Sequence, residues 1–97
     1  MSVSVLVEGI LKDEFELAFP ELCAEAFVVT RSFDGCQKIH LTLNVENEKN
    51  FVLNEVWDSE EHYRKYLNFR IQDGTIDLIK DMCSEGPNIR IFQVKDV

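Results

Sequence analysis

The chain has 97 residues, of which 45% are hydrophobic, and its 10 Lys and Arg against 18 Asp and Glu give a net charge of −8. This length suits one domain with a thin core, so we expect a single domain over residues 1–97 that gains from a second subunit. Nucleic acids and anionic membrane surfaces are bound through lysine and arginine, so the acidic charge argues against both as partners.

The ends and the cysteines indicate the compartment. No apolar run reaches the roughly 18 residues that a membrane-spanning helix needs, and Met1–Gly9 lacks the basic start and the cleavage site of a signal peptide. We therefore expect a cytoplasmic protein. Cys23, Cys36 and Cys83 are odd in number and far apart, whereas disulfides and zinc sites favour even, closely spaced cysteines. We expect reduced thiols and no metal site.

The first quarter of the chain predicts a strand and a helix. Valines alternate with other residues over residues 3–11, which favours a strand with one buried face. Asp13 and Glu16 have the spacing of a capping box, and apolar residues then recur at intervals of three and four up to Phe27. Pro20 lies inside this stripe, so the helix either begins there or is kinked there, and the continuity of the stripe favours a kink.

The middle of the chain predicts two strands. After the turn at Asp34-Gly35, residues 39–45 alternate between apolar and polar, and a short polar connection leads to a strand over residues 51–57. The alternation of this strand puts on one face Phe51, Leu53, Glu55 and Trp57, and on the other Val52, Asn54 and Val56. Asp58 or Ser59 is expected to cap the helix that follows.

The last third predicts two helices and a strand. The helix that follows Ser59 is expected to end near Asp73-Gly74, where Thr75 caps a shorter helix that Gly86-Pro87 stops. Residues 89–94 then form the last strand.

The resulting order β-α-β-β-α-α-β predicts an α+β, ferredoxin-like (βαββαβ) fold, with an antiparallel four-stranded sheet and helices on one face. The other face would remain bare, and a monomer rarely exposes several hundred Å² of apolar sheet. We therefore expect two sheets to close face to face into a dimeric α+β barrel.

Three strings carry a family resemblance: T-R-S-F-D-G-C-Q from Thr30, F-V-L-N-E-V-W-D-S-E-E-H-Y-R-K-Y-L-N-F-R, and P-N-I-R-I-F. They resemble the antibiotic biosynthesis monooxygenase (ABM domain) family, and in particular its small quinol monooxygenase members. The most specific part is the E-x-W of Glu55 and Trp57 before a Ser-capped helix that carries aromatic residues. The resemblance covers almost the whole chain and implies a dimeric α+β barrel with a pocket between sheet and helices in each subunit.

The resemblance also implies a class of reaction. Some members of this family oxidise aromatic polyketides or quinols with O₂ and without metal or flavin. It therefore implies a cofactor-independent monooxygenase that oxidises a small electron-rich aromatic, a quinol or an anthrone-like compound, with O₂. Other members are isomerases or haem-degrading enzymes or have no known activity. The alternatives are therefore one of those enzymes, or a non-catalytic dimeric module that binds a small ligand or responds to stress.

Three residues of the helix after Ser59 are the expected catalytic residues. His62 is the best available proton acceptor, because an unperturbed histidine has a pKa of about 6.5, although a solvated or structural role is the alternative. Many relatives have a histidine where this chain has Tyr66, so a general-base assignment based on that histidine fails here. Tyr63, which matches a pocket aromatic of the oxygenases, and Arg70 are expected to hydrogen-bond a substrate oxyanion.

Four residues are expected to bind the substrate. Trp57 would stack on the aromatic ring, with an aromatic core as the alternative, and Tyr66 would lie beside it. Asn54 resembles an asparagine that precedes the tryptophan in the oxygenases, although alternation puts it on the opposite strand face. Glu55 lies on the face of Trp57, where a structural ion pair with Arg70 would offset its desolvation.

Overall fold

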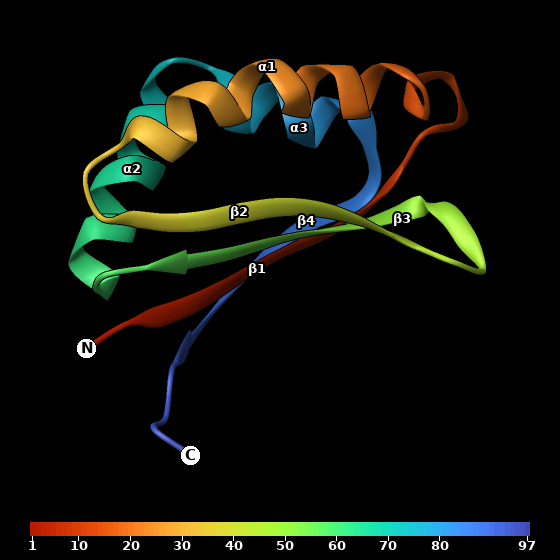
Figure 1. Cartoon of the computed structure of the whole chain (residues 1–97). Helices are drawn as coiled ribbons and strands as arrows, with labels where there is room; N and C mark the ends of the chain where they lie inside the picture. Colours follow the sequence, from red (N-terminus) through yellow and green to blue (C-terminus); the bar gives the residue numbers. More distant parts are fainter.

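The computed structural model describes residues 1–97 and shows one four-stranded sheet with all helices on one face (Figure 1). The elements are β1 (Val3–Leu11), a 3₁₀ turn (Asp13–Phe15), α1 (Ala18–Ser32), β2 (Cys36–Asn44), β3 (Asn47–Trp57), α2 (Glu60–Gln72), α3 (Thr75–Met82) and β4 (Cys83–Gln93). All neighbouring strands are antiparallel in the order β2-β3-β1-β4. The predicted α+β, ferredoxin-like fold is confirmed. None of the helices is long and apolar enough to cross a membrane.

The register of the sheet places Glu55 near its centre. β1 and β2 flank β3, and they pair Val5 and Ile39 with Glu55 from either side. The helix-facing side chains of β1 and β3 alternate with those of the open face, as the period-two pattern predicts. The carboxylate of Glu55 is thus carried by a rigid element with strands on both sides.

The first helix starts differently from the prediction. A 3₁₀ turn precedes α1, and no side chain caps either of them, so the expected capping box of Asp13 and Glu16 does not form. Pro20 is the third residue of α1. The expected kink is therefore wrong, because in the first turn the missing N–H of a proline has no intrahelical acceptor to lose. The buried stripe of α1 consists of Phe19, Cys23, Phe27 and Thr30.

The last helix and the last strand also differ from the prediction. Gly74, with φ of +86°, holds the N-cap position of α3, so Thr75 is the first residue of the helix and not its cap, and its N–H donates to Asp73 Oδ1. The strand β4 begins at Cys83, immediately after α3, and includes the Gly86-Pro87 pair that was expected to lie before it. Gly86 has φ of +80°, and a Cβ there would lie 2.8 Å from the Glu8 carbonyl oxygen. The register shift in the pairing of β4 with β1 therefore requires glycine at this position.

The sheet face opposite the helices has no covering element (Figure 1). It carries polar pairs such as Asn54 with Thr42 and Glu8 with Arg90. Between them the register places the apolar side chains of Leu6, Ile10, Val52, Val56 and Phe92. Phe92 is 45% exposed. This is the face that the sequence predicts to pair with a second copy.

Candidate functional site

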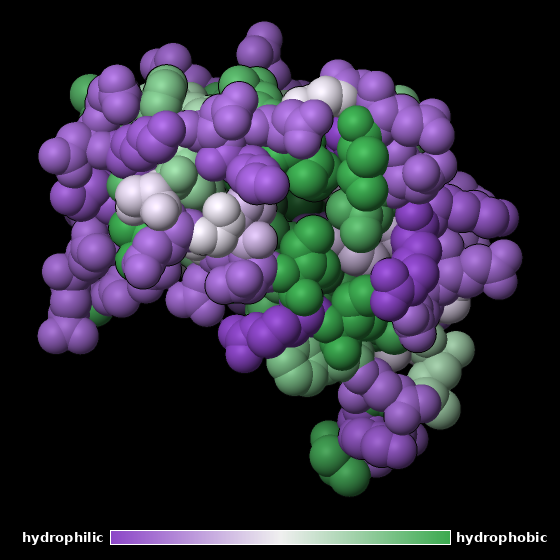
Figure 2. Space-filling model, turned by 180° about the vertical axis from the view of Figure 1, so that it is seen from behind, coloured by the Kyte–Doolittle hydropathy of each residue, from purple (hydrophilic) through white to green (hydrophobic).

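A cavity of about 40 Å³ lies between the helix face of the sheet and the three helices. Its wall is mostly apolar, with Val7 and Leu53 from the sheet and Ile79 from α3. Seen from the rear, the molecule has a band of apolar side chains around a hollow (Figure 2). The ionisable or hydroxyl-bearing side chains in the wall are Cys23, Glu55, Tyr63, Tyr66, Arg70 and Thr75.

Glu55 is the buried carboxylate of this cavity, with only 3% of its surface exposed. The Trp57 indole N–H donates to Glu55 Oε1 at 3.0 Å. The E-x-W pattern thus has a local cause, because residues two apart on a strand share one face. No protein group donates to Glu55 Oε2, and every side-chain polar atom sealed from solvent has a partner. We conclude that Oε2 faces the cavity.

Burial raises the pKa of Glu55 from its usual 4.5 to about 7, and the hydrogen bond from Trp57 opposes this shift only in part. The expected ion pair with Arg70 is absent, so no cation stabilises the charged form. A carboxyl group with this pKa is substantially ionised at neutral pH and accepts protons more readily than an exposed carboxylate.

Tyr63 contributes a hydroxyl to the same cavity. It lies in the first turns of α2, it is 2% exposed, and its hydroxyl forms no hydrogen bond within the protein. Burial, and next the negative charge of Glu55, raise the pKa of Tyr63. The phenol therefore stays protonated and can donate a hydrogen bond to a ligand.

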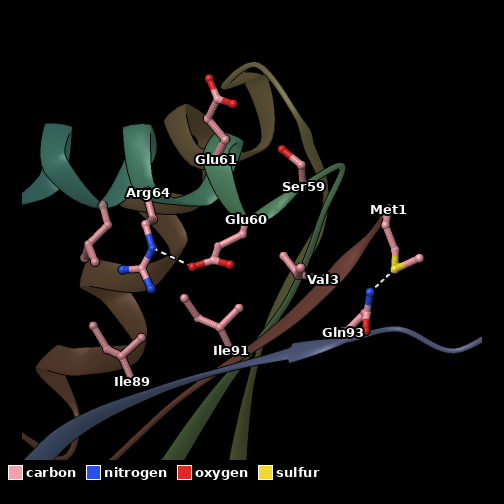
Figure 3. Close-up of a pocket in the computed structure, with 10 residues that line it drawn as sticks. Met1, Val3, Ser59, Glu60, Glu61, Arg64, Ile89, Ile91 and Gln93 are labelled. Carbon is pink, nitrogen blue, oxygen red and sulfur yellow. Dashed lines mark hydrogen bonds and ion pairs between the residues drawn. The ribbon is translucent and has the colours of Figure 1, made fainter.

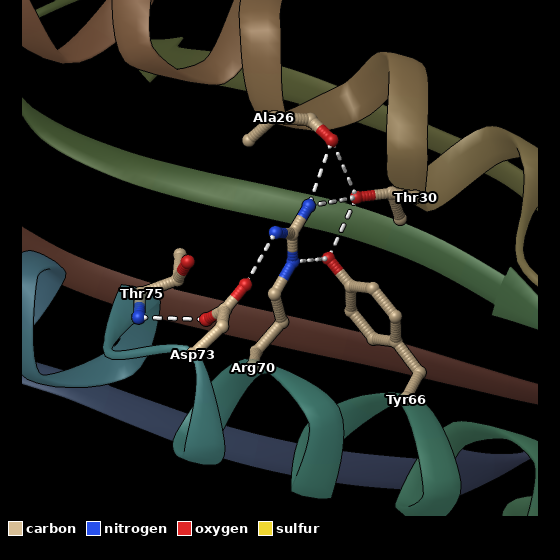
Figure 4. Close-up of polar contacts among 6 residues, drawn as sticks. All are labelled: Ala26, Thr30, Tyr66, Arg70, Asp73 and Thr75. Atoms are coloured by element: carbon tan, nitrogen blue, oxygen red, sulfur yellow. Dashed lines mark hydrogen bonds and ion pairs between the residues drawn. The ribbon is translucent and has the colours of Figure 1, made fainter.

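Arg70 and Tyr66 form a polar cluster that joins the helices (Figure 4). Arg70 Nε donates to the Tyr66 hydroxyl at 2.9 Å, Nη1 to Asp73 Oδ2 at 3.0 Å and Nη2 to the Ala26 carbonyl at 2.8 Å. The Tyr66 hydroxyl is also 2.6 Å from Thr30 Oγ1. The expectation that Arg70 binds a substrate oxyanion is not supported, because these donors already have acceptors on α1 and α2 and beside α3.

Trp57 lies in an aromatic cluster behind the cavity wall. It is fully buried, and its ring centroid is 4.9 Å from that of Tyr66 and 5.8 Å from that of Tyr63. It is not part of the lining of the cavity. The expected stacking of Trp57 on a substrate ring is therefore not supported. Its indole instead orients the carboxylate of Glu55.

Besides Trp57, two further expected site residues, His62 and Asn54, do not line the cavity. His62 Nδ1 lies 2.6 Å from Ser59 Oγ, and Nε2 lies 3.7 Å from Asp34 Oδ2 at the surface. His62 lies beside the α1–β2 turn because its position follows the cap of α2 at Ser59, which agrees with the alternative of a solvated or structural histidine. Asn54 is on the open sheet face, as the alternation predicts, where it donates to Thr42 Oγ1, and it does not line the cavity.

Sequence reasoning missed Thr30 and Asp73, the acceptors that fix Tyr66 and Arg70. A hydroxyl residue on the apolar stripe of α1 could have indicated Thr30, since a buried hydroxyl needs a partner. Cys23 reaches the cavity, but burial raises the pKa of its thiol to about 12, which argues against a thiolate nucleophile. No three His, Cys, Asp or Glu side chains gather into a group that could hold a metal ion.

Residues 3–70 match the sequence profile of the antibiotic biosynthesis monooxygenase family. The chain belongs to this family. No curated protein shows a significant match.

Solved structures share the fold of this antibiotic biosynthesis monooxygenase family member. A conserved protein from Methanosarcina mazei is 19% identical with a TM-score of 0.89, and the alignment covers 98% of this chain and 94% of that one. A Deinococcus radiodurans protein described as an antibiotic biosynthesis monooxygenase is 18% identical, with a TM-score of 0.83 over 100% and 95% of the two chains. A cofactor-independent oxygenase from Streptomyces nogalater is 11% identical, with a TM-score of 0.84 over 99% and 95%.

In this family member the site combines one proton acceptor and one hydrogen-bond donor in an apolar wall. Glu55 and Tyr63 both line the cavity. An apolar molecule with an acidic O–H or C–H could place that hydrogen at Glu55, and the resulting anion could accept a hydrogen bond from Tyr63.

Proposed function

We propose that the chain is a cofactor-independent monooxygenase that oxidises a small electron-rich aromatic with O₂. The observation that carries the proposal is Glu55, a carboxylate in an apolar cavity whose pKa burial raises to about 7 and whose second oxygen has no protein partner. The family and the fold shared with a cofactor-independent oxygenase support the same class of reaction. The proton acceptor is Glu55 in place of the His62 expected from the sequence.

The reaction is written for an anthrone-like methylene. Glu55 takes the proton of the C–H, and Tyr63 stabilises the anion through a hydrogen bond. The anion transfers one electron to O₂, and the radical pair joins to form a C–O bond and a peroxide anion. The proton returns from Glu55 to the peroxide, which loses water, so that R₂CH₂ and O₂ give R₂C=O and H₂O. The apolar wall limits competing reactions of these intermediates with water.

Oxygen uptake by the purified, metal-stripped protein tests this proposal. With a panel of hydroquinones and anthrones we expect uptake above autoxidation, with an acid limb near pH 7 that reports the ionisation of Glu55. Glu55→Gln removes the proton acceptor but keeps the size of the side chain, and we expect turnover to fall by about 100-fold or more. Trp57→Phe removes a hydrogen bond that favours the charged carboxylate, so the acid limb should move to higher pH.

His62→Gln is the matched control, since His62 contacts Ser59 and is absent from the cavity lining. We expect it to retain the turnover and the pH profile of the unchanged protein. A loss of turnover in His62→Gln with normal turnover in Glu55→Gln would overturn the assignment of the base. Binding of these aromatics without any oxygen uptake would overturn the oxygenase and favour a ligand-binding module.

We also propose that the protein is a homodimer in which the open sheet faces pack together. The apolar group around Val56 and Leu6 lies on the two central strands and has no cover within the chain. Sedimentation of the unchanged protein at micromolar concentration is expected to show a dimer. Val56→Glu should dissociate this dimer, because it would bury a carboxylate without a partner between the sheets. Val28→Glu, at a 68% exposed position on the helix side, should leave the dimer intact. A monomeric unchanged protein would contradict the proposal.

A further inference from the structure

We propose that Leu67 is a gate and a specificity-determining residue between the Glu55 cavity and a larger outer cleft. In this arrangement a neutral aromatic puts its hydroxyl or acidic C–H past Leu67 toward Glu55, and the rest of its ring system lies in the cleft. The inference rests on the proposed function for the role of Glu55. It adds the route of entry, the charge of the substrate and the residue that selects its size.

The outer cleft lies between α2 and the edge strand β4 and has a volume of about 920 Å³ (Figure 3). Val3, Ile89 and Ile91 form an apolar floor on the sheet, and Glu60 and Arg64 of α2 lie above it. Ligand sites typically have volumes of roughly 300–1,000 Å³. The cleft is therefore large enough to hold an aromatic ring system.

Leu67 separates the two spaces. It is the one residue that lines both the cleft and the cavity. On α2 it lies three residues after Arg64, which lines the cleft, and four residues after Tyr63, which lines the cavity. The side chain of Leu67 is half-buried, and in the proposed gate a change of its rotamer connects cleft and cavity without movement of the helix.

The size of the inner cavity requires such a connection. Its volume of about 40 Å³ holds a few water-sized groups, whereas an apolar cavity that takes up benzene has a volume of about 150 Å³. A phenolic hydroxyl or the ring edge that bears an acidic CH₂ fits beside Glu55, but the rest of the ring system does not. The ring must therefore occupy the space of Leu67 and the cleft beyond it.

The charges at the cleft favour a neutral substrate. Glu60 and Glu61 stand at its rim, and the guanidinium of Arg64 is engaged by Glu60 at 2.8 Å. Arg70, the cation in the wall of the inner cavity, is held by Tyr66, Asp73 and Ala26. The rim thus has two carboxylates beside one guanidinium, and the net charge of −8 repels a carboxylate or sulfonate on the ligand.

Calorimetric titration without oxygen tests the gate independently of turnover. We expect 2-naphthol, a neutral two-ring phenol, to bind the unchanged protein, and Leu67→Phe to weaken this binding at least ten-fold. Leu67→Ala merges the two spaces and should retain or improve the affinity. Leu78→Ala is the matched control, because Leu78 is 46% exposed on α3 and lines neither space. Thermal unfolding of each variant checks that it is folded.

Affinities that change equally in Leu67→Phe and Leu78→Ala, or no binding of 2-naphthol at millimolar concentration, would overturn the gate. The anion 6-hydroxy-2-naphthoate should bind at least ten-fold more weakly than 2-naphthol, and equal affinities would overturn the preference for neutral ligands. A dependence of binding on Leu67 together with no oxygen uptake would contradict only the proposed oxygenase.

Discussion

Glu55→Gln is expected to stabilise the protein at pH 8, although it removes the proposed catalytic base. The native pKa of about 7 lies above the usual value of 4.5, so between these pH values the native state holds a proton that the unfolded state has lost. Stability therefore falls as pH rises through this window. A shift of about 2.5 units corresponds to about 3 kcal/mol above pH 7. Glutamine is neutral at every pH and avoids this loss, while its oxygen can still accept from Trp57.

Urea unfolding at pH 5 and at pH 8 measures this effect. At pH 5 the variant and the unchanged protein should differ little, because native Glu55 is then protonated. At pH 8 the free energy of unfolding of Glu55→Gln should be higher by about 3 kcal/mol. Glu61→Gln, on the exposed side of α2, is the matched control and should leave the free energy of unfolding nearly unchanged. Equal effects of Glu55→Gln at both pH values would show that the native carboxyl titrates normally.

Arg70→Met is expected to lower the free energy of unfolding by about 3 kcal/mol, because it removes the centre of a largely buried ion-pair and hydrogen-bond cluster. The Arg70 side chain is 8% exposed and donates to Tyr66, Asp73 and Ala26. Methionine keeps much of the apolar stem but none of these bonds. In a domain of this size, the loss corresponds to a fall of the melting temperature by more than about 10 °C.

Arg64→Met provides the matched control on the same helix. Arg64 forms an ion pair with Glu60 across one turn, and its side chain is 60% exposed, so the substitution should change stability by less than about 0.5 kcal/mol. Thermal unfolding followed by circular dichroism compares the two variants. If Arg70→Met and Arg64→Met lowered the free energy of unfolding by the same small amount, the cluster around Arg70 would not hold the helices together.

The strands and the order of elements were predictable because their causes are local. A period of two marks the buried face of β3, and Ser59 caps α2 through its own side chain. The start of α1 was not predictable in this way. The apolar stripe runs on across Pro20, and only the packing of the chain after β1 decides that a 3₁₀ turn precedes the helix.

In the candidate site, too, some features follow from the repeat of a single element and others depend on how the elements pack. The sequence by itself determined that Glu55 and Trp57 share a strand face and that Tyr63, Tyr66 and Arg70 share a helix face, since each set depends on the repeat of one element. The tertiary structure alone decided that Arg70 pairs with Asp73 and leaves Glu55 without a cation. Such partners depend on how α1, α2 and α3 approach one another over the sheet. The desolvation that raises the pKa of Glu55 exists only after this packing is complete.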